Sequence, residues 1–191
     1  MTKDQLYKEL DYVNHSREKR IHYANLVINN PELIAPLLEI LFTVDDKISC
    51  RAAWVFEFMC SKQIEEVLPY LDTFTENMGR VYLDSAVRPI AKVSELISKS
   101  YSSKTDNQIK QLLTSVHIER IVEACFDWMI SNQKVAVKAY SMQTLYLLGK
   151  SIDWIHPELL IILERDFSSQ SAAFRARARH IIGLLKKEKS K

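Results

Sequence analysis

The chain has 191 residues and a formal net charge of +2, with 47% apolar and 26% charged residues. This composition is typical of a soluble globular protein, and the length suits one domain over residues 1–191. Only three Gly and five Pro are present, which disfavours long loops and frequent tight turns. No apolar run approaches the roughly 20 residues of a membrane span, and the charged start "MTKDQLYKELDY" lacks a signal-peptide core.

Helix start signals recur along the chain. Thr2 followed by Gln5 is a capping box. Asn30-Pro31-Glu32 combines an N-cap amide, a Pro in the first turn and an acid near the positive end of a helix. Helices are expected at 3–14, 17–29, 31–42, 47–61, 64–76, 81–98, 107–113, 116–131, 134–149, 157–166 and 171–187, and no segment shows the alternation of a β-strand.

The expected helix 47–61 is apolar on nearly every side. One face carries Val55, Phe56 and Met59, and Trp54 and Phe58 are apolar on other faces. A helix of this kind is buried between neighbours. We therefore expect it to be central in the fold.

A repeated pattern organises the chain. "PELIAPLLEILFTVDDKISCRAA" at 31–53 returns in altered form as "PELLIILERDFSSQSAAFRARA" at 157–178. Arg51, Lys138 and Arg175 each follow a polar break, precede an Ala and head a second helix, and Asp84 heads a weaker fourth copy. One helical pair cannot bury its own apolar face, so such pairs stack on one another.

This pattern resembles the HEAT and armadillo-like repeat proteins over residues 31–187. The resemblance is carried by Pro36 and Pro69 early in first helices, by Asp45 and Asp46 in a turn, and by Arg51 at the head of a second helix. It implies an all-α, right-handed α–α superhelix of about ten helices. It also implies that Asp45 or Asp46 pairs with Arg51 and ties adjacent turns together.

The resemblance divides the single domain into segments. We expect an N-terminal helical cap at 1–30, repeat pairs at 31–98 and 116–187, and a polar insertion at 99–115 that contains "SYSSKTDNQ". The whole chain is also similar to short all-helical bacterial proteins that sometimes carry the label adenylosuccinate lyase. That resemblance implies a lyase activity, although the lyase signature loop Ser-Ser-x-Met-Pro-x-Lys-x-Asn has no counterpart in these residues.

Motifs of catalysis and metal binding are missing from the sequence. There is no Gly-x-Ser-x-Gly nucleophile motif, and three scattered glycines cannot form a phosphate-binding loop. His117, in the first turn of its helix, is expected to be exposed. We expect no cofactor and no metal, because none of the five histidines has ligand spacing: His15, His22, His117, His156 and His180.

The three cysteines bear on the cellular compartment. Cys50, Cys60 and Cys125 are odd in number, widely spaced and set in apolar surroundings. This pattern favours reduced thiols in a protein core. We therefore expect a cytoplasmic protein.

The C-terminal end is strongly basic. Residues 171–191 carry seven Lys and Arg against one Glu, a net charge of +6, which leaves −4 for the rest of the chain. Two interpretations are open, a solvated terminal cap and a surface for an anionic partner. The candidate surface consists of Arg175, Arg177, Arg179, Lys186 and Lys187.

These observations favour a non-catalytic helical-repeat scaffold that binds a macromolecule, most simply a protein. The alternative is a nucleic-acid-binding protein related to HEAT-like DNA glycosylases, which bind DNA through Trp, Asp and Arg. The chain offers Trp54, Trp128, Trp154, Arg51 and Arg88 for that role. Outside the basic end, however, the acidic body would repel a phosphate backbone.

Overall fold

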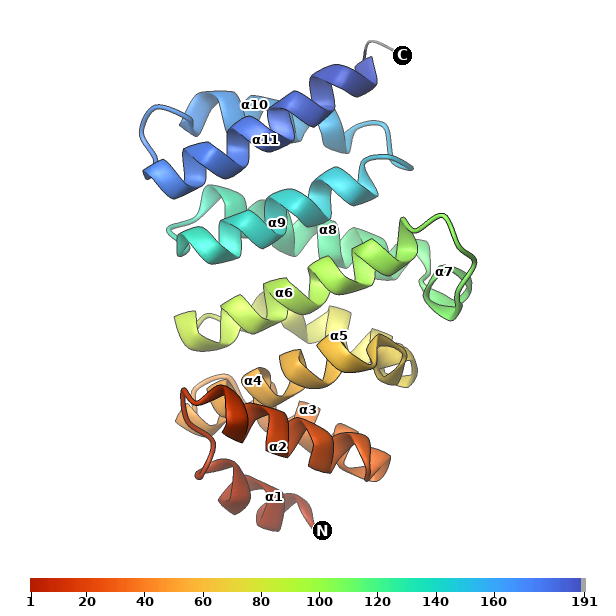
Figure 1. Ribbon diagram of the computed structural model, residues 1–191, viewed down its shortest axis with the longest axis vertical. Helices are drawn as coiled ribbons and strands as arrows, with labels where there is room; N and C mark the ends of the chain where they lie inside the picture. Colours follow the sequence, from red (N-terminus) through yellow and green to blue (C-terminus); the bar gives the residue numbers. More distant parts are fainter. Residues whose placement is uncertain (190–191) are drawn as a thin grey trace.

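The computed structural model describes residues 1–189, and within them every regular element is helical (Figure 1). Helices account for 78% of the chain, which confirms the all-α class. In this range the α-helices are α1 (Lys3–Leu10), α2 (Arg17–Ile28), α3 (Ile34–Leu41), α4 (Lys47–Lys62), α5 (Leu71–Asn77), α6 (Asp84–Tyr101), α7 (Gln108–Leu112), α8 (Ser115–Ile130), α9 (Val135–Leu148), α10 (Ile155–Asp166) and α11 (Ala172–Lys189). Short 3₁₀ segments are η1 (Pro31–Leu33), η2 (Ile64–Tyr70) and η3 (Met78–Arg80).

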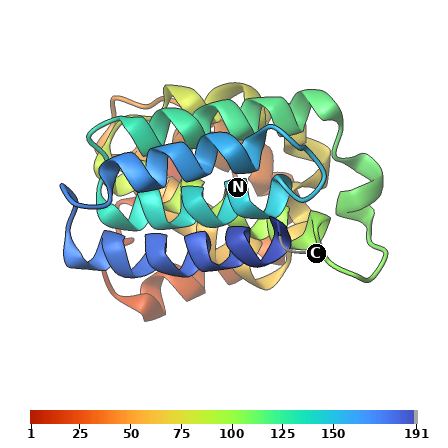
Figure 2. The ribbon, with the colours of Figure 1, turned by 90° about the horizontal axis from the view of Figure 1, so that it is seen from above.

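The helices stack in two layers, so the molecule is a helical solenoid (Figures 1 and 2). One layer holds α2, α4, α6, α9 and α11, and each of these helices packs against the next. The second layer holds α1, α3, α5, α8 and α10, in which α1 packs on α3 and α5 packs on α8. The terminal helices α1 and α11 lie at opposite ends of the stack. The solenoid predicted from the repeated pattern is confirmed.

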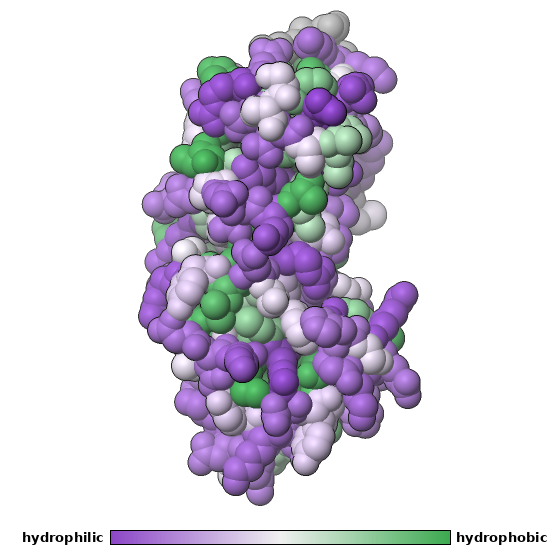
Figure 3. Space-filling view, turned by 90° about the vertical axis from the view of Figure 1, so that its left-hand side faces the viewer, coloured by the Kyte–Doolittle hydropathy of each residue, from purple (hydrophilic) through white to green (hydrophobic). Residues whose placement is uncertain are grey.

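A single apolar core runs through the stack from Leu6 in α1 to Leu185 in α11. Its centre is α4, which contacts α1, α2, α3 and α6. Phe56 of α4 is fully buried, and its ring centroid lies 5.7 Å from that of Phe74 in α5. The expected central position of this helix is confirmed. The outer surface seen in Figure 3 is mostly hydrophilic, with apolar residues scattered among polar ones.

The segment expected as one helix over 64–76 is divided into η2 and α5. Pro69 lies inside η2. In an α-helix its ring would clash with the carbonyl of Glu65, and its missing N–H would leave that carbonyl unpaired. The expected helix at 3–14 ends at Leu10 instead, and a separate turn follows it, in which the Asn14 side chain accepts the Ser16 amide N–H at 2.8 Å.

A second proline interrupts the hydrogen bonding of α6. Pro89 has no N–H to donate to the carbonyl oxygen of Ser85, four residues earlier. The indole N–H of Trp54, on α4, donates to that oxygen at 2.7 Å. A side chain of one helical pair therefore completes the backbone hydrogen bonding of the next pair.

The expected ion pair between Arg51 and its own turn is wrong. The Arg51 guanidinium binds the carboxylate and the backbone carbonyl of Asp11, at the end of α1. Arg51 lies in the second turn of α4, and α4 packs against α1, so the long side chain reaches the neighbouring helix instead of Asp45 or Asp46. The contact joins two helical pairs.

The turn before α4 also makes contacts between pairs. Asp46 caps α4 by accepting the amide N–H of Ile48 at 2.9 Å, and it accepts the hydroxyl of Tyr7 from α1. Asp45 accepts the hydroxyl of Tyr82, which precedes α6. The two carboxylates thus connect this turn to the helical pairs before and after it.

The other basic residues of the repeated column differ from Arg51 in their surroundings. Lys138 is 5% exposed in α9. The pKa of the Asp166 carboxyl is lowered by the hydrogen bond from Arg165 and, to a smaller extent, by the charge of Lys138. Arg175 is exposed on α11. The column therefore marks the start of second helices and does not repeat one ion pair.

Gly149 ends α9 beneath the ring of His156, and a Cβ atom there would lie 2.1 Å from the ring Cδ2. The His156 ring is held by a 2.8 Å hydrogen bond between Nε2 and the Tyr146 carbonyl oxygen and by stacking on the Tyr146 ring. We expect Gly149→Ala to lower the free energy of unfolding by about 2 kcal/mol through overpacking.

Urea denaturation measures this effect, and Gly183→Ala is the matched control. Gly183 is exposed in α11, and a Cβ atom there would meet nothing within 4 Å, so Ala should stabilise the helix by about 0.5–1 kcal/mol. Combining Gly149→Ala with His156→Ala should remove most of the overpacking cost. A loss from Gly149→Ala that is the same with and without the His156 ring would contradict this explanation.

Candidate functional site

The predicted basic surface lies on α11, the last helix of the stack. Arg175 and Arg179 are exposed one turn apart, and the Arg179 guanidinium lies 5.7 Å from the centroid of the Phe167 ring. Lys186 and Lys187 are exposed further along the same helix. Four of the five residues of the candidate surface are therefore exposed on one helix, and one is not.

That exception is Arg177, which turns toward the neighbouring helices. Its Nη2 donates to Oε1 of Gln143 on α9 at 3.2 Å and lies 4.0 Å from Oε1 of Glu95 on α6. Among the described residues, no hydrogen bond joins the Arg175 side chain to the 168–171 turn before α11. The Ser171 hydroxyl caps α11 instead, by accepting the amide N–H of Phe174 at 3.3 Å.

We expect Arg177→Gln to destabilise the fold more than the double change Arg175→Gln/Arg179→Gln. Exposed charges contribute little, so the double variant should change the free energy of unfolding by less than about 1 kcal/mol. Arg177 makes a charge-assisted hydrogen bond that is half-buried, and its loss should cost about 1–2 kcal/mol. Urea denaturation of the two variants tests this order, and the reverse order would contradict it.

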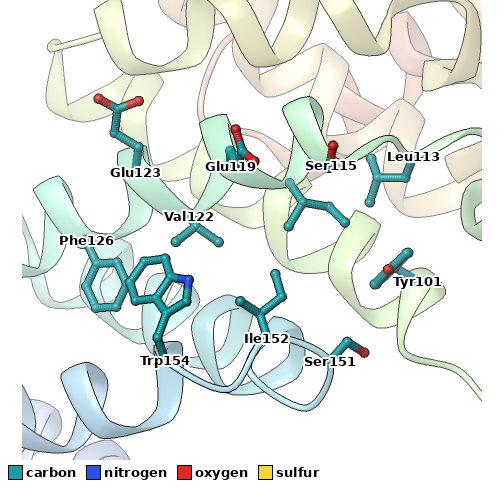
Figure 4. Close-up of a pocket in the computed structure, with 11 residues that line it drawn as sticks. Tyr101, Leu113, Ser115, Glu119, Val122, Glu123, Phe126, Ser151, Ile152 and Trp154 are labelled. Atoms are coloured by element: carbon teal, nitrogen blue, oxygen red, sulfur yellow. The ribbon is translucent and has the colours of Figure 1, made fainter.

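An open apolar cleft of about 720 Å³ lies at the edge of the second layer (Figure 4). It forms beside α8, where α8 and α10 make few contacts with each other, and α10 is held by α9 and α11. Residues from the end of α6, from the turn between α7 and α8, from α8 and from the loop between α9 and α10 line it. They are Tyr101, Leu113, Ser115, Ile118, Glu119, Val122, Glu123, Phe126, Ser151, Ile152 and Trp154.

Trp154 forms one end of the cleft. Its side chain is 55% exposed, and its ring stacks on that of Phe126 with centroids 5.7 Å apart and planes at 22° (Figure 4). The other two tryptophans, Trp54 and Trp128, are 8% and 4% exposed. An exposed Trp beside further apolar side chains presents a large apolar area to solvent, which is typical of an interaction site.

Acidic residues border the cleft along α8. Glu119 and Glu123 are exposed one helical turn apart at its edge, and Asp127, one turn further along α8, lies outside the cleft. Within residues 1–189, no cationic side chain pairs with either glutamate. By contrast, Glu76 nearby is paired with Arg120 at 3.0 Å. Like charges one turn apart destabilise a helix when no cation offsets them.

His117 is 5% exposed, which corrects the expectation that it faces solvent. It is the N3 residue of α8 and forms a capping box with the N-cap residue Thr114, whose backbone N–H its Nδ1 accepts at 3.2 Å. Its Nε2 lies 2.9 Å from Oδ1 of Asp72 on α5. These contacts explain the histidine as a structural link between α8 and α5.

The cysteine thiols are buried and poorly reactive. Burial raises the pKa of the Cys125 thiol to about 12 and that of Cys60 well above its usual value. Both therefore stay protonated and poorly nucleophilic at neutral pH. Within residues 1–189, no group of three or more His, Cys, Asp or Glu side chains is arranged to hold a metal ion.

The residues considered for DNA binding make contacts within the protein. The Arg20 guanidinium lies 4.3 Å from the centroid of the Trp54 ring, whose N–H is bonded to Ser85. Arg88 donates to both carboxylate oxygens of Glu57, at 3.2 and 2.7 Å. Of the three tryptophans, Trp154 alone is exposed. It shares its cleft with Glu119 and Glu123, and the described residues that line this cleft include no Lys, Arg or His.

Comparison with known proteins agrees with the fold. The stacked pairs define a helical-repeat protein, and the family model described as HEAT repeat domain matches residues 7–184. The chain belongs to the HEAT repeat family. No curated protein and no solved structure matches it. None of the helices within residues 1–189 is long and apolar enough to cross a membrane.

Sequence reasoning missed the cleft. It unites three segments, around Tyr101, over 113–126 and over 151–154, that are far apart in the chain. Two local signals were available. Glu119, Glu123 and Asp127 form a like-charge stripe along one helix. Trp154 lies in a short break between two helices, so it belongs to no apolar helix face that would bury it.

Proposed function

We propose that this protein is a non-catalytic helical-repeat scaffold that binds another protein. The observation that carries the proposal is the exposed Trp154, stacked on Phe126 at the end of an open apolar cleft. Stacked helical repeats present extended binding surfaces, and Trp is enriched at the energetic centres of protein interfaces. The basic surface of α11 is a second candidate contact for the same partner.

Two further points of the proposal follow from the sequence. We propose a cytoplasmic location, supported by the three free and buried cysteines. We propose function without a cofactor, because the sequence has no phosphate-binding glycine loop and no histidines at ligand spacing. Lyase activity, implied by the second resemblance, is checked by incubating the protein with adenylosuccinate and following its absorbance.

Nucleic-acid binding is the alternative function. Its support is the basic end, with Arg175 and Arg179 exposed on α11. Against it, the cations of α6 are paired with carboxylates, Arg88 with Glu57 and both Lys92 and Lys99 with Glu95. Titration of labelled duplex DNA at several salt concentrations decides the matter, because phosphate contacts give an affinity that falls steeply with salt.

The test of protein binding compares wild type with Trp154→Ala. Each protein is immobilised and exposed to native lysate of the source cells, and retained proteins are identified by mass spectrometry. We expect one or more proteins to be retained by wild type and lost with Trp154→Ala. Tyr12→Ala, which removes an aromatic side chain that is 66% exposed at the other end of the stack, is the matched control. Identical retention by all three proteins would refute the role of the cleft.

A further inference from the structure

We propose that the cleft binds a basic amphipathic helix of the partner protein. Such a segment carries aliphatic or aromatic side chains on one face and Lys or Arg along the border of that face. This inference rests on the proposed function and specifies the chemistry of the partner.

The length of the cleft fits a helix. Its α8 wall runs from Ser115 to Phe126, a distance of about 16 Å at the rise of an α-helix. Tyr101 and Leu113 lie at one end, and Phe126 and Trp154 at the other (Figure 4). About three turns of a partner helix therefore fit along it, which places apolar anchors at helical spacing against the cleft.

The place of the cleft in the stack also favours a helix. The second layer is built of helices that lie side by side, and α5 and α8 pack directly. Contacts between α8 and α10 are few, and the apolar side chains left uncovered in the cleft are the half-buried Phe126 of α8 and Trp154, which is 55% exposed. A partner helix would supply that missing packing.

The carboxylates on the border of the cleft favour a partner helix with positive charge. Glu119 and Glu123 line the cleft one turn apart, and neither forms a salt bridge among the described side chains. Asp127, one turn further along α8, lies outside the cleft and lines a separate hollow with Arg80 and Arg120. Lys or Arg residues at i and i+4 of a partner helix would meet Glu119 and Glu123 and offset their mutual repulsion. Complementary charge fixes orientation and speeds association.

A second copy of this chain fits the cleft less well. The most basic helix of the chain is α11, but its apolar residues Phe174, Ala178, Ile181 and Leu185 are buried in its own core. Without unfolding, α11 has no apolar face to place against Trp154. We therefore assign the cleft to a different protein.

The first experiment selects ligands without assuming their chemistry. A phage library of random 16-residue peptides is selected on wild type after depletion on Trp154→Ala. We expect enriched peptides to combine Leu, Ile, Phe or Trp at helical spacing with Lys or Arg. Enrichment of acidic peptides, of peptides without helical periodicity, or of none would overturn the proposal.

The second experiment tests the charges with the best synthetic peptide. We expect Glu119→Lys/Glu123→Lys to weaken its binding at least tenfold at low salt. Glu32→Lys/Glu65→Lys makes the same change in net charge at exposed positions outside the cleft and should leave the affinity within twofold. Equal affinities for the two charge variants would contradict the basic chemistry of the partner. Circular dichroism and urea denaturation establish that each variant is folded.

The outcomes separate this inference from the proposed function. If a lysate protein depends on Trp154 but not on Glu119 and Glu123, the scaffold function stands and the basic helix is wrong. If no protein depends on Trp154, both fail. Analytical ultracentrifugation tests whether a second copy of the chain occupies the cleft. A wild-type dimer that Trp154→Ala dissociates would assign the cleft to that second copy.

Discussion

Replacing Phe56 by Ala is expected to lower the free energy of unfolding by about 3–5 kcal/mol, the usual cost of removing a large side chain from a core. Phe56 is fully buried in α4, the helix that contacts neighbours in both layers, and its ring lies against Phe74. The stacked pairs surround the site, so they cannot easily close the cavity that Ala would leave. Urea denaturation measures the loss as a lower midpoint.

Phe58→Ala is the matched control for this prediction. Phe58 lies on the same helix two residues away but is only half-buried. The same truncation there removes less buried surface and leaves no enclosed cavity, so the loss should be well under half of that for Phe56. Similar losses at the two positions would mean that α4 is not the centre of the core.

Glu95→Ala is expected to destabilise the protein by about 3 kcal/mol, near the lower end of the range for breaking a buried ion pair. Glu95 is 2% exposed in α6. Its carboxylate accepts from Nζ of Lys92 at 2.6 Å and lies 2.8 Å from Nζ of Lys99 and 4.0 Å from the Arg177 guanidinium. The cations are partly exposed and recover some hydration when the carboxylate is removed, which moderates the cost.

The contribution of Glu95 should depend on pH. Burial alone raises the pKa of the carboxyl, but the hydrogen bonds and charges of Lys92 and Lys99 outweigh it and hold the pKa below its ordinary value of 4.5. A folded-state pKa that is depressed stabilises the fold above the unfolded pKa, and this stability is lost as the pH falls through the folded value. The gap in unfolding free energy between wild type and Glu95→Gln should therefore be full at neutral pH and shrink below about pH 4.5. A gap that stays constant down to pH 3 would show that the charge of Glu95 is irrelevant.

The layered stack could be predicted from local signals. Capping residues and prolines mark helix ends through residues a few positions apart. The apolar sides of 47–61 predict a buried helix whichever elements pack against it. The pairing of Arg51 was not predictable in the same way. Its actual partner, Asp11, is 40 residues away, and the spacing of Arg51 from Asp45 and Asp46 is equally compatible with a local ion pair. The choice depends on how α4 packs against α1.

The cleft lay beyond sequence reasoning for a related reason. It exists because two helices of one layer fail to pack, and the apolar residues on α8 carry the same helical pattern whether a neighbour covers them or not. The basic residues of α11 were easier to find, since charge can be counted along a chain. Whether a charge is exposed, as in Arg175, or turned toward the stack, as in Arg177, is decided by packing.

The bond from Trp54 to the Ser85 carbonyl gives the stack a direction of assembly. Pro89 leaves one backbone acceptor of α6 without its usual donor, and α4 supplies the replacement from earlier in the chain. On the ribosome the N-terminal part of a protein emerges first and begins to fold first. The α4 segment that carries the indole donor therefore emerges before the broken turn of α6, and α6 is completed on a helix made before it. A permuted chain that presents α6 before α4 would have to wait for that donor, with an unpaired carbonyl in the first turn of α6.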